Sequence, residues 1–367
     1  MGVSPARRWA FHPLAGGRVA ALADRRLPAH GTVSGRAGAA PLYPQNRMPP
    51  ARTSQRSAPS SSADRPGGPA ADPGPYGPVG RSAWLDVDWN EHRRFAEIDG
   101  RRVNVVELGA GDRTMVFVHG LAGSWQNWLE NLPHFAAAGY RVVAFDLPGF
   151  GGSDMPEEKI SIPGYGRFVD DLLDRLGVGP AIVVGNSMGG FISAELAIQF
   201  PARVDRLVLV SAAGLTIEYQ RNERILGALQ YGERFISAWG GFVGARSDAV
   251  ARRPRARQML MRLVVASPDL LPAPLIAEQV RGSGKPGFVD ALDALTDYPI
   301  RERLGHIGCP TLIVWGTEDH LVPVRDADEF ERLIPGARKV VWPETGHMAM
   351  LERPAAFNAL VEAFAAE

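Results

Sequence analysis

The chain has 367 residues, and its 40 lysine and arginine residues balance its 40 aspartate and glutamate residues. Zero net charge gives no electrostatic footprint for a nucleic-acid partner, and no apolar run reaches the roughly 20 residues that a membrane-spanning helix needs. The single cysteine, Cys309, cannot form an internal disulfide, which fits a reducing compartment. We therefore expect a cytoplasmic protein, and the oligomeric state stays open.

The N-terminal segment has a composition of its own. Its first 62 residues contain nine arginines, one acidic residue and no lysine, and residues 49–80 hold eight prolines and five glycines. A segment without sustained apolar periodicity cannot bury a face, so residues 1–83 are expected to form a disordered leader. Arg7 and Arg8 weakly resemble a twin-arginine export signal, which leaves export open as an alternative, and a natural start at Met48 is also open.

Strand and helix patterns alternate from residue 93 onward. Residues 93–98 and 101–106 flank Asp99-Gly100, which predicts a hairpin with a type I′ turn. Further strands are expected at 114–118, 141–145, 181–184, 311–315 and 339–342, and one more is expected to end at Val210. Alternation of this kind predicts a mostly parallel sheet with helices on both faces.

The alternation stops between residues 214 and 299. This stretch lies between the sixth and seventh expected strands, so the domain prediction is a core formed by 84–213 and 300–367, with 214–299 as a helical insertion. Most of its apolar residues are expected to pack inward, and the remainder to line an apolar acyl or aryl pocket. The apolar residues are Leu226, Leu229, Phe235, Ile236, Trp239, Phe242, Met259, Leu260, Met261, Leu263 and Val264. Arg252, Arg253, Arg255 and Arg257 form a cluster expected to be a solvated face, with contact to a substrate carboxylate as the alternative.

A Gly-x-Ser-x-Gly sequence joins one expected strand to the following helix. In the hexapeptide Gly-Asn-Ser-Met-Gly-Gly at 185–190, Ser187 would occupy a sharp, strained turn that lifts its hydroxyl clear of the sheet edge. Gly185 and Gly189 lack the Cβ atoms that would collide across such a turn. The helix N-terminus favours developing negative charge, and Ser187 is therefore the expected nucleophile.

A serine needs a base, and the base needs a group that orients it. After this type of turn, the acid and then the histidine follow along the chain. His347 and Asp319 each come just past the end of an expected strand, which is where sites assemble in open α/β sheets. We predict His347 as the base and Asp319 as its partner, with Glu318 and Asp146 as the alternative acids.

An acyl-transfer site also needs two backbone N–H groups that bind the oxyanion. The amide of Met188, directly after the nucleophile, is one expected donor, and the loop after the strand at 114–118 should supply the other. Gly120 allows a tight turn there, which would direct the Leu121 N–H inward. His119 is expected to hold this loop by hydrogen bonding, without transferring protons.

These motifs resemble those of the α/β-hydrolase superfamily over residues 93–367. The residues that carry the resemblance are His119-Gly120, Asp146-Leu147-Pro148-Gly149-Phe150-Gly151-Gly152-Ser153, the turn at Ser187, Gly316-Thr317-Glu318-Asp319 and Gly346-His347. The resemblance implies an α/β fold with a mostly parallel doubly wound sheet and a helical cap inserted after the sixth strand. It also implies two-step acyl transfer through an acyl-enzyme, on a small-molecule substrate, with no metal and no organic cofactor.

The superfamily hosts many reactions, so the substrate is less well defined. The turn around Asn186 is similar to that of hydrolases that cleave carbon–carbon bonds in ring-fission products. The chain lacks their Gly/Pro-rich oxyanion loop, and Met348 stands where they usually carry tryptophan. Haloalkane dehalogenases have aspartate at the position of Ser187. Ester hydrolysis is therefore the primary prediction, with carbon–carbon hydrolysis and a non-catalytic binding scaffold as alternatives.

Overall fold

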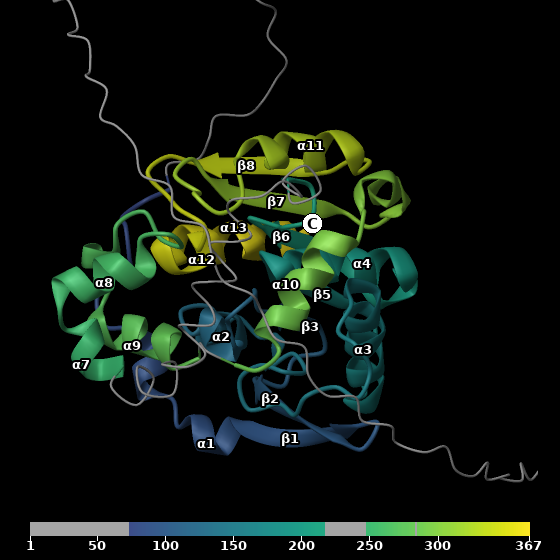
Figure 1. Cartoon of the computed structure of the whole chain (residues 1–367), viewed down its shortest axis with the longest axis horizontal. Coiled ribbons are helices and arrows are strands. Elements are labelled where there is room, and N and C mark those ends of the chain that lie inside the picture. Colours follow the sequence, from purple (N-terminus) through teal and green to yellow (C-terminus); the bar gives the residue numbers. More distant parts are fainter. Residues whose placement is uncertain (1–72, 217–246, 283–284) are drawn as a thin grey trace, which may run out of the picture. The chain divides into compact units, whose positions relative to one another are not determined.

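The computed structural model describes residues 73–216, 247–282 and 285–367 (Figure 1). Predictions for residues 1–72, and for the apolar insertion residues Leu226, Leu229, Phe235, Ile236, Trp239 and Phe242, lie outside the described residues.

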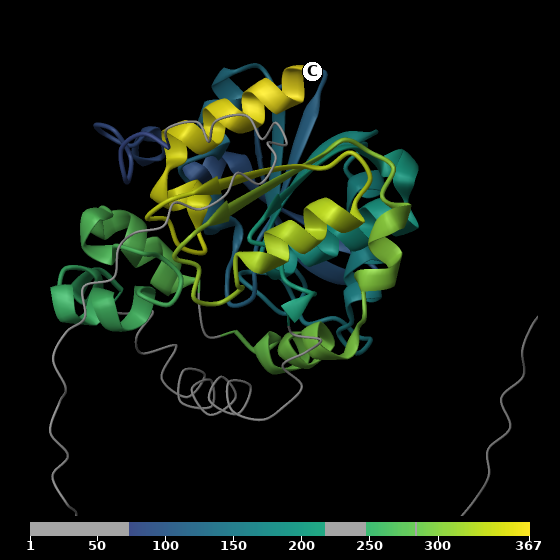
Figure 2. The same ribbon diagram turned by 90° about the horizontal axis from the view of Figure 1, so that it is seen from above.

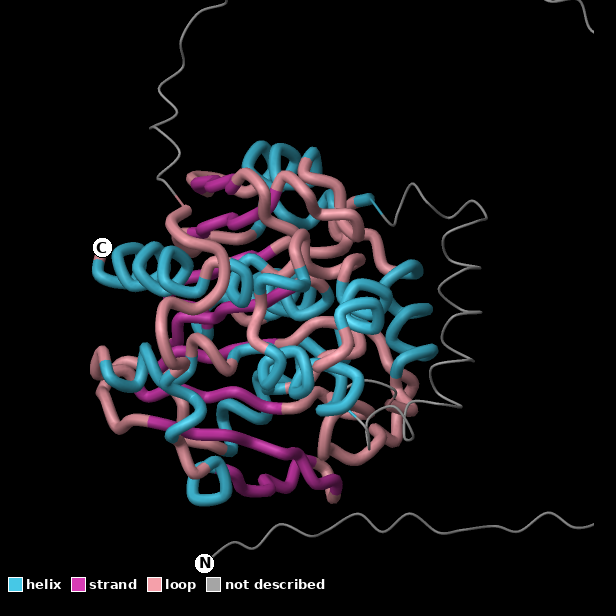
Figure 3. The backbone as a smooth tube through the Cα atoms, turned by 90° about the vertical axis from the view of Figure 1, so that its left-hand side faces the viewer, coloured by secondary structure: helices cyan, strands magenta, loops and turns pink. Residues whose placement is uncertain are grey.

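Within the described residues, eight strands form one sheet in the order β1-β2-β4-β3-β5-β6-β7-β8. Figure 3 shows the strands, in magenta, side by side. The strands are β1 (Arg93–Ile98), β2 (Arg101–Leu108), β3 (Thr114–Val118), β4 (Arg141–Phe145), β5 (Ala181–Asn186), β6 (Val204–Val210), β7 (Thr311–Gly316) and β8 (Arg338–Trp342). β2 pairs antiparallel with both β1 and β4, and every other pair is parallel. The expected strands and the mostly parallel sheet are confirmed.

The hairpin between β1 and β2 has the predicted turn. Ile98 pairs with Arg101, and the two residues between them have positive φ, 48° at Asp99 and 72° at Gly100. A type I′ turn requires this left-handed conformation at both central positions.

Helices cover both faces of the sheet. The α-helices are α1 (Trp89–His92), α2 (Leu132–Ala137), α3 (Ile162–Arg175), α4 (Met188–Gln199), α7 (Ser247–Ala251), α8 (Pro254–Met261), α9 (Ala273–Arg281), α10 (Phe288–Asp297), α11 (Arg325–Leu333), α12 (Ala349–Glu352) and α13 (Pro354–Ala366). The 3₁₀ helices are η1 (Ala83–Asp86), η2 (Trp125–Trp128), η3 (Pro201–Arg203), η4 (Pro268–Leu270) and η5 (Arg301–His306).

Alternate residues of the central strands face two separate cores, as the two-residue period of a strand requires. In β3, Val116 and Val118 pack in the core beneath α3, α4 and α11, whereas Met115 and Phe117 pack in the core beneath α2 and α13. Figure 2 shows α11 and α13 on opposite sides of the sheet. Strands buried on both faces read as continuous apolar runs, which is why the sequence identified them.

The described part of the insertion between β6 and β7 is helical, with α7, α8 and α9 side by side (Figure 1). Arg252, Arg253 and Arg255 are exposed, as predicted for a solvated face. Arg257 differs, because its guanidinium donates to the carbonyls of Pro268, at 2.6 Å, and Leu271. It therefore holds the chain at η4 and is not part of the solvated face.

Residues 73–83, which the domain prediction assigns to the leader, are described in the structure, and part of this segment is hydrogen-bonded to the C-terminal part of the chain. The Gly77 N–H donates to the Glu352 carbonyl at 2.6 Å, and the Gly74 carbonyl accepts from Arg353 Nη1 at 2.7 Å. Tyr76 donates its hydroxyl proton to the Glu352 carboxylate. Backbone hydrogen bonds and one tyrosine hold this segment, and neither leaves a periodic apolar pattern in the sequence.

Candidate active site

Ser187 lies between the end of β5 and the start of α4 and has φ 56° and ψ −120°. This conformation is strained for a residue with a side chain and is found mostly at functional positions. Backbone hydrogen bonds hold it in place, because its N–H donates to the Val210 carbonyl and its carbonyl accepts from the Ala213 N–H, both at 3.0 Å. Ser187 is partly exposed, whereas Asn186 and Met188 on either side are buried.

The glycines around this turn permit main chains to approach closely. A Cβ atom on Gly185 would lie 2.3 Å from the Gly189 carbonyl oxygen, and one on Gly189 would lie 2.2 Å from the Val118 carbonyl oxygen. Both distances are far below a van der Waals contact, so only glycine fits at these positions without displacing the backbone. The turn is thereby packed directly against the end of β3.

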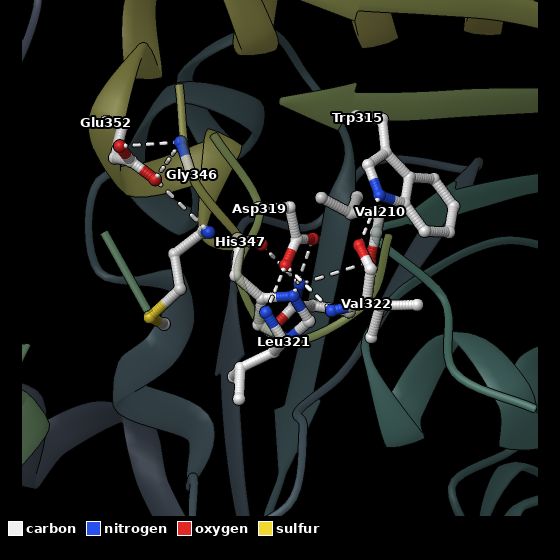
Figure 4. A network of polar contacts seen from close by, with 10 residues as sticks. Val210, Trp315, Asp319, Leu321, Val322, Gly346, His347 and Glu352 are labelled. Atoms are coloured by element: carbon white, nitrogen blue, oxygen red, sulfur yellow. Dashed lines mark hydrogen bonds and ion pairs between the residues drawn. The ribbon is translucent and has the colours of Figure 1, made fainter. Parts of the chain in front are cut away.

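His347 and Asp319 are paired at the same edge of the sheet (Figure 4). The His347 Nδ1–H donates to Asp319 Oδ2 at 2.8 Å, and both side chains are buried. The other carboxylate oxygen accepts from the backbone N–H groups of Leu321 and Val322, each at 2.9 Å. Burial alone would raise the pKa of Asp319, but His347 and the Val322 amide outweigh it and hold that pKa below its usual range.

The two alternative acids lie elsewhere. The side chain of Glu318 is exposed, and its backbone N–H donates to the Thr345 carbonyl at 2.8 Å. Asp146 is buried and accepts three hydrogen bonds at 2.8 Å, from Asn104 Nδ2 and from the N–H groups of Trp125 and Gly152. Its carboxylate joins β2 to the segments that follow β3 and β4.

His119 has the hydrogen bonds expected of a loop support. Its Nε2 accepts from the Leu147 N–H at 2.9 Å, so Nδ1 carries the proton and donates to the Gly120 carbonyl at 2.8 Å. Burial lowers the pKa of His119, which favours this neutral form.

The loop after β3 contacts the serine turn. A Cβ atom on Gly120 would lie 3.1 Å from the Ser187 Cβ, and the Gly123 N–H closes the loop on the Gly120 carbonyl at 3.0 Å. Met188 is the first residue of α4, where helix geometry leaves the backbone N–H without a partner inside the helix. The amides of Leu121 and Met188 therefore belong to two segments in direct contact.

Sequence reasoning missed two side chains that hold the histidine loop. Asn186 Nδ2 donates to the carbonyls of Val210, at 3.1 Å, and His347, at 3.2 Å. The fully buried Glu352 accepts from the N–H groups of Gly346 and Met348, on either side of His347 (Figure 4). Asn186 stood inside a recognised motif, whereas Glu352 carried no periodic or strand-end signal.

A cavity of about 270 Å³ lies next to the loop after β3, lined by Ser124 and Gln126 and by Arg93, Arg281 and Lys285. Its lining includes neither Ser187 nor His347. Across 73–216, 247–282 and 285–367, no three His, Cys, Asp or Glu residues are grouped so that they could bind a metal ion. The helices described in these ranges include none with the length and apolarity to span a bilayer.

Comparison with known proteins places this geometry in a family. The chain is 33% identical over 280 residues to the dihydrolipoyllysine-residue acetyltransferase component of the acetoin cleaving system of Cupriavidus necator, with 73% of this chain and 68% of that protein covered. It is 31% identical over 278 residues to a 2-hydroxy-6-oxononadienedioate/2-hydroxy-6-oxononatrienedioate hydrolase of Cupriavidus pinatubonensis, with 72% and 90% covered.

Among solved structures, Est816, an N-acyl homoserine lactone degrading enzyme, superposes with a TM-score of 0.57 at 27% identity, with 74% of this chain and 100% of that chain covered. The family profile described as alpha/beta hydrolase fold matches residues 113–354, which include every residue predicted for the site. The chain therefore belongs to the α/β-hydrolase fold family.

Proposed function

We propose that the protein is a serine hydrolase that acts on carboxylic esters or related acyl compounds through an acyl-enzyme. Ser187 attacks the carbonyl carbon, and His347 accepts the hydroxyl proton at Nε2. Asp319 accepts the hydrogen bond from Nδ1, fixes the tautomer and stabilises the imidazolium that forms. The leaving alcohol takes the proton from His347. Water, deprotonated by the same histidine, then releases the acid.

One observation carries this proposal: a strained, partly exposed serine lies at the same sheet edge as a buried histidine–aspartate pair. The Nδ1–Oδ2 hydrogen bond of 2.8 Å leaves Nε2 of His347 as the nitrogen able to accept a proton. The N–H groups of Leu121 and Met188 are proposed to bind the oxyanion, because their two segments are in contact beside Ser187.

The 214–299 insertion is proposed as a cap that covers the substrate, and residues 84–213 and 300–367 as the catalytic core. Thr216, at the start of the insertion, is anchored to the core, because its N–H donates to Asp326 Oδ2 at 2.8 Å and its hydroxyl donates to Oδ1. The relatives named as hydrolases support hydrolytic chemistry on a small organic substrate.

Replacement of the nucleophile tests this function. Ser187→Ala should fold normally and lose about 10⁴- to 10⁶-fold in kcat on a p-nitrophenyl ester, because a site without its nucleophile retains only binding and oxyanion stabilisation. A fluorophosphonate should label the wild-type protein at Ser187 and leave the variant unlabelled. Turnover by the variant within about tenfold of wild type would remove Ser187 from the mechanism, and failure to label the wild type would favour a non-catalytic scaffold.

Carbon–carbon bond hydrolysis is the second candidate. Several relatives are named as hydrolases of 2-hydroxy-6-oxo dienoates, and such substrates carry a carboxylate that needs a fixed partner. Arg281 and Lys285 offer positive charge beside Ser124, next to the loop after β3. The side-chain amide of Asn127, in η2, donates a hydrogen bond to Gln279 Oε1 at 2.7 Å.

One preparation assayed on both substrates separates the two reactions. We expect kcat/KM on short to medium acyl p-nitrophenyl esters to exceed that on a 2-hydroxy-6-oxo dienoate by at least about tenfold, which corresponds to about 1.4 kcal/mol of transition-state discrimination. Ser187→Ala serves as the blank for both. A preference for the dienoate would replace the ester proposal with the carbon–carbon one.

A further inference from the structure

Glu352 is a fully buried carboxylate to which the reaction proposed above assigns no role. It lies at the end of α12 and accepts hydrogen bonds from three backbone N–H groups: Gly346 at 2.9 and 3.0 Å, Met348 at 3.3 Å and Ala266 at 2.9 Å. The Tyr76 hydroxyl donates a further bond at 2.6 Å. Burial raises the pKa of Glu352, and these donors act in the opposite direction.

The donors come from three distant parts of the chain. Gly346 and Met348 flank His347, Ala266 belongs to the insertion between α8 and η4, and Tyr76 belongs to the ordered N-terminal segment. The histidine loop and the insertion also touch directly, because the Met348 N–H donates to the Val264 carbonyl at 3.1 Å. A Cβ atom on Gly346 would lie 2.7 Å from the Ala266 nitrogen. One carboxylate therefore connects the proposed base to the insertion.

Tyr76 completes this connection. Its hydroxyl donates its one proton to Glu352 and accepts from the Ser267 N–H at 2.9 Å. The Arg353 guanidinium lies 5.0 Å from the centroid of the Tyr76 ring, and Arg353 also donates to the Gly74 carbonyl at 2.7 Å. The tyrosine is thus held on both sides, which gives its hydroxyl a fixed direction toward Glu352.

We propose that Glu352 and Tyr76 are positioning residues that align His347 with Ser187 only when the segment 264–267 of the insertion is docked on the core. Hydrogen bonds to the amides on both sides of His347 restrict rotation of its loop, and the same carboxylate binds the amide of Ala266. A displacement of about 1 Å at a reacting group can reduce turnover by about 100-fold, so the alignment of His347 with Ser187 should affect kcat. The inference rests on the proposed role of His347 as the base.

The test compares two tyrosine variants, each of which lacks a hydroxyl that donates a hydrogen bond to a buried glutamate. Tyr76→Phe removes the bond to Glu352. Tyr298→Phe is the matched control, because its hydroxyl donates at 2.9 Å to Glu195, a fully buried carboxylate outside the histidine loop. Tyr76→Phe should lower kcat on the ester by about tenfold with KM changed less than about twofold, whereas the control should keep the wild-type kcat. Tyr76→Phe should lower Tm more, because it also leaves the Ser267 N–H without its acceptor, whereas Glu195 keeps its hydrogen bonds from Arg303.

Glu352→Gln keeps the shape but turns an amide NH₂ toward backbone donors, so its kcat should fall by about 100-fold or more. If this variant does not fold, Tyr76→Phe decides alone. A direct readout is the downfield proton NMR resonance of the His347–Asp319 hydrogen bond, which should shift in Tyr76→Phe and stay in place in Tyr298→Phe.

The outcomes separate the two proposals. Equal kcat values for both tyrosine variants, with an unshifted resonance, would overturn the positioning role while Ser187-dependent turnover of the wild type still supports the hydrolase. A wild type without Ser187-dependent turnover would overturn the proposed function. In that case the NMR comparison still reports whether Tyr76 aligns His347.

Discussion

The replacement Asp319→Asn tests the proposed charge and tautomer arrangement at a single atom. Asp319 accepts three hydrogen bonds, one from His347 at Oδ2 and two from the backbone N–H groups of Leu321 and Val322 at Oδ1. Asparagine has one acceptor oxygen. That oxygen should stay with the two backbone donors, so the side-chain NH₂ would face His347 Nδ1 and force the proton of the imidazole onto Nε2. A histidine with Nε2–H cannot accept the proton of Ser187.

The size of the effect follows from the cost of the opposite orientation. Turning the amide so that its oxygen accepts from His347 would leave two buried backbone donors unpaired, at about 1–3 kcal/mol each. Together they cost about 2–6 kcal/mol, so the productive tautomer would be populated about 30- to 10⁴-fold less, and kcat should fall by that factor. Because the side-chain volume is conserved, the fold should remain.

The assay measures kcat on a p-nitrophenyl ester for Asp319→Asn and for Glu318→Gln. The control makes the same change from carboxylate to amide one residue earlier, at an exposed side chain, and should stay within about twofold of wild type. Equal losses in the two variants would refute the reasoning. A larger loss at Glu318 would mean that the acid has been assigned to the wrong residue.

Three further predictions concern stability. Deletion of residues 1–72 should leave the unfolding free energy unchanged within about 1 kcal/mol. Deletion of residues 1–80 should lower it by about 1–3 kcal/mol, because Glu352 loses the hydrogen bond from Tyr76. Equal melting curves for the two deletions would show that Tyr76 contributes nothing to stability. In urea unfolding, Arg257→Ala should destabilise the protein by about 1–3 kcal/mol and Arg255→Ala by less than about 0.5 kcal/mol. A larger loss for Arg255→Ala would contradict the contacts assigned to Arg257. The folded-state pKa of Asp319 lies below its ordinary 3.8, so its ionised form stabilises the fold above that pH, and the stabilisation is lost as the pH falls through the folded-state value. Acid unfolding should therefore be less steep in Asp319→Asn than in wild type, and parallel curves would argue against an ionised Asp319.

The sequence predicted the sheet well because parallel strands buried on both faces read as unbroken apolar runs. Val116 and Phe117 face opposite cores, yet both are apolar, and the same holds along β5 and β7. The hairpin was predictable for a different reason, since Asp99-Gly100 favours positive φ at both positions. Local pattern and turn chemistry were sufficient for these elements.

The candidate site was predictable to the extent that its residues follow strand ends. His347 and Asp319 were chosen by that rule, and their side chains are hydrogen-bonded in the structure. Glu352 and Tyr76 escaped because their contacts with each other and with the amides of Ala266 and Ser267 join segments far apart along the chain, and such contacts depend on the tertiary fold. The hydrogen bonds that join residues 74 and 77 to Arg353 and Glu352 are contacts of the same kind. The assignment of Ser187, His347 and Asp319 to catalysis, and the choice of ester over dienoate, stay predictions.

Main-chain atoms of Gly189 and Val118 are packed so closely that the serine turn and the end of β3 are in direct backbone contact. If the amides of Leu121 and Met188 bind the oxyanion, their placement depends on backbone contacts and hardly at all on side-chain identity. The Leu121 side chain, which is partly exposed and packs at the edge of the core, then takes no part in the oxyanion contact itself. Randomising residue 121 should therefore change the preference for the acyl chain while the two proposed oxyanion donors stay in place.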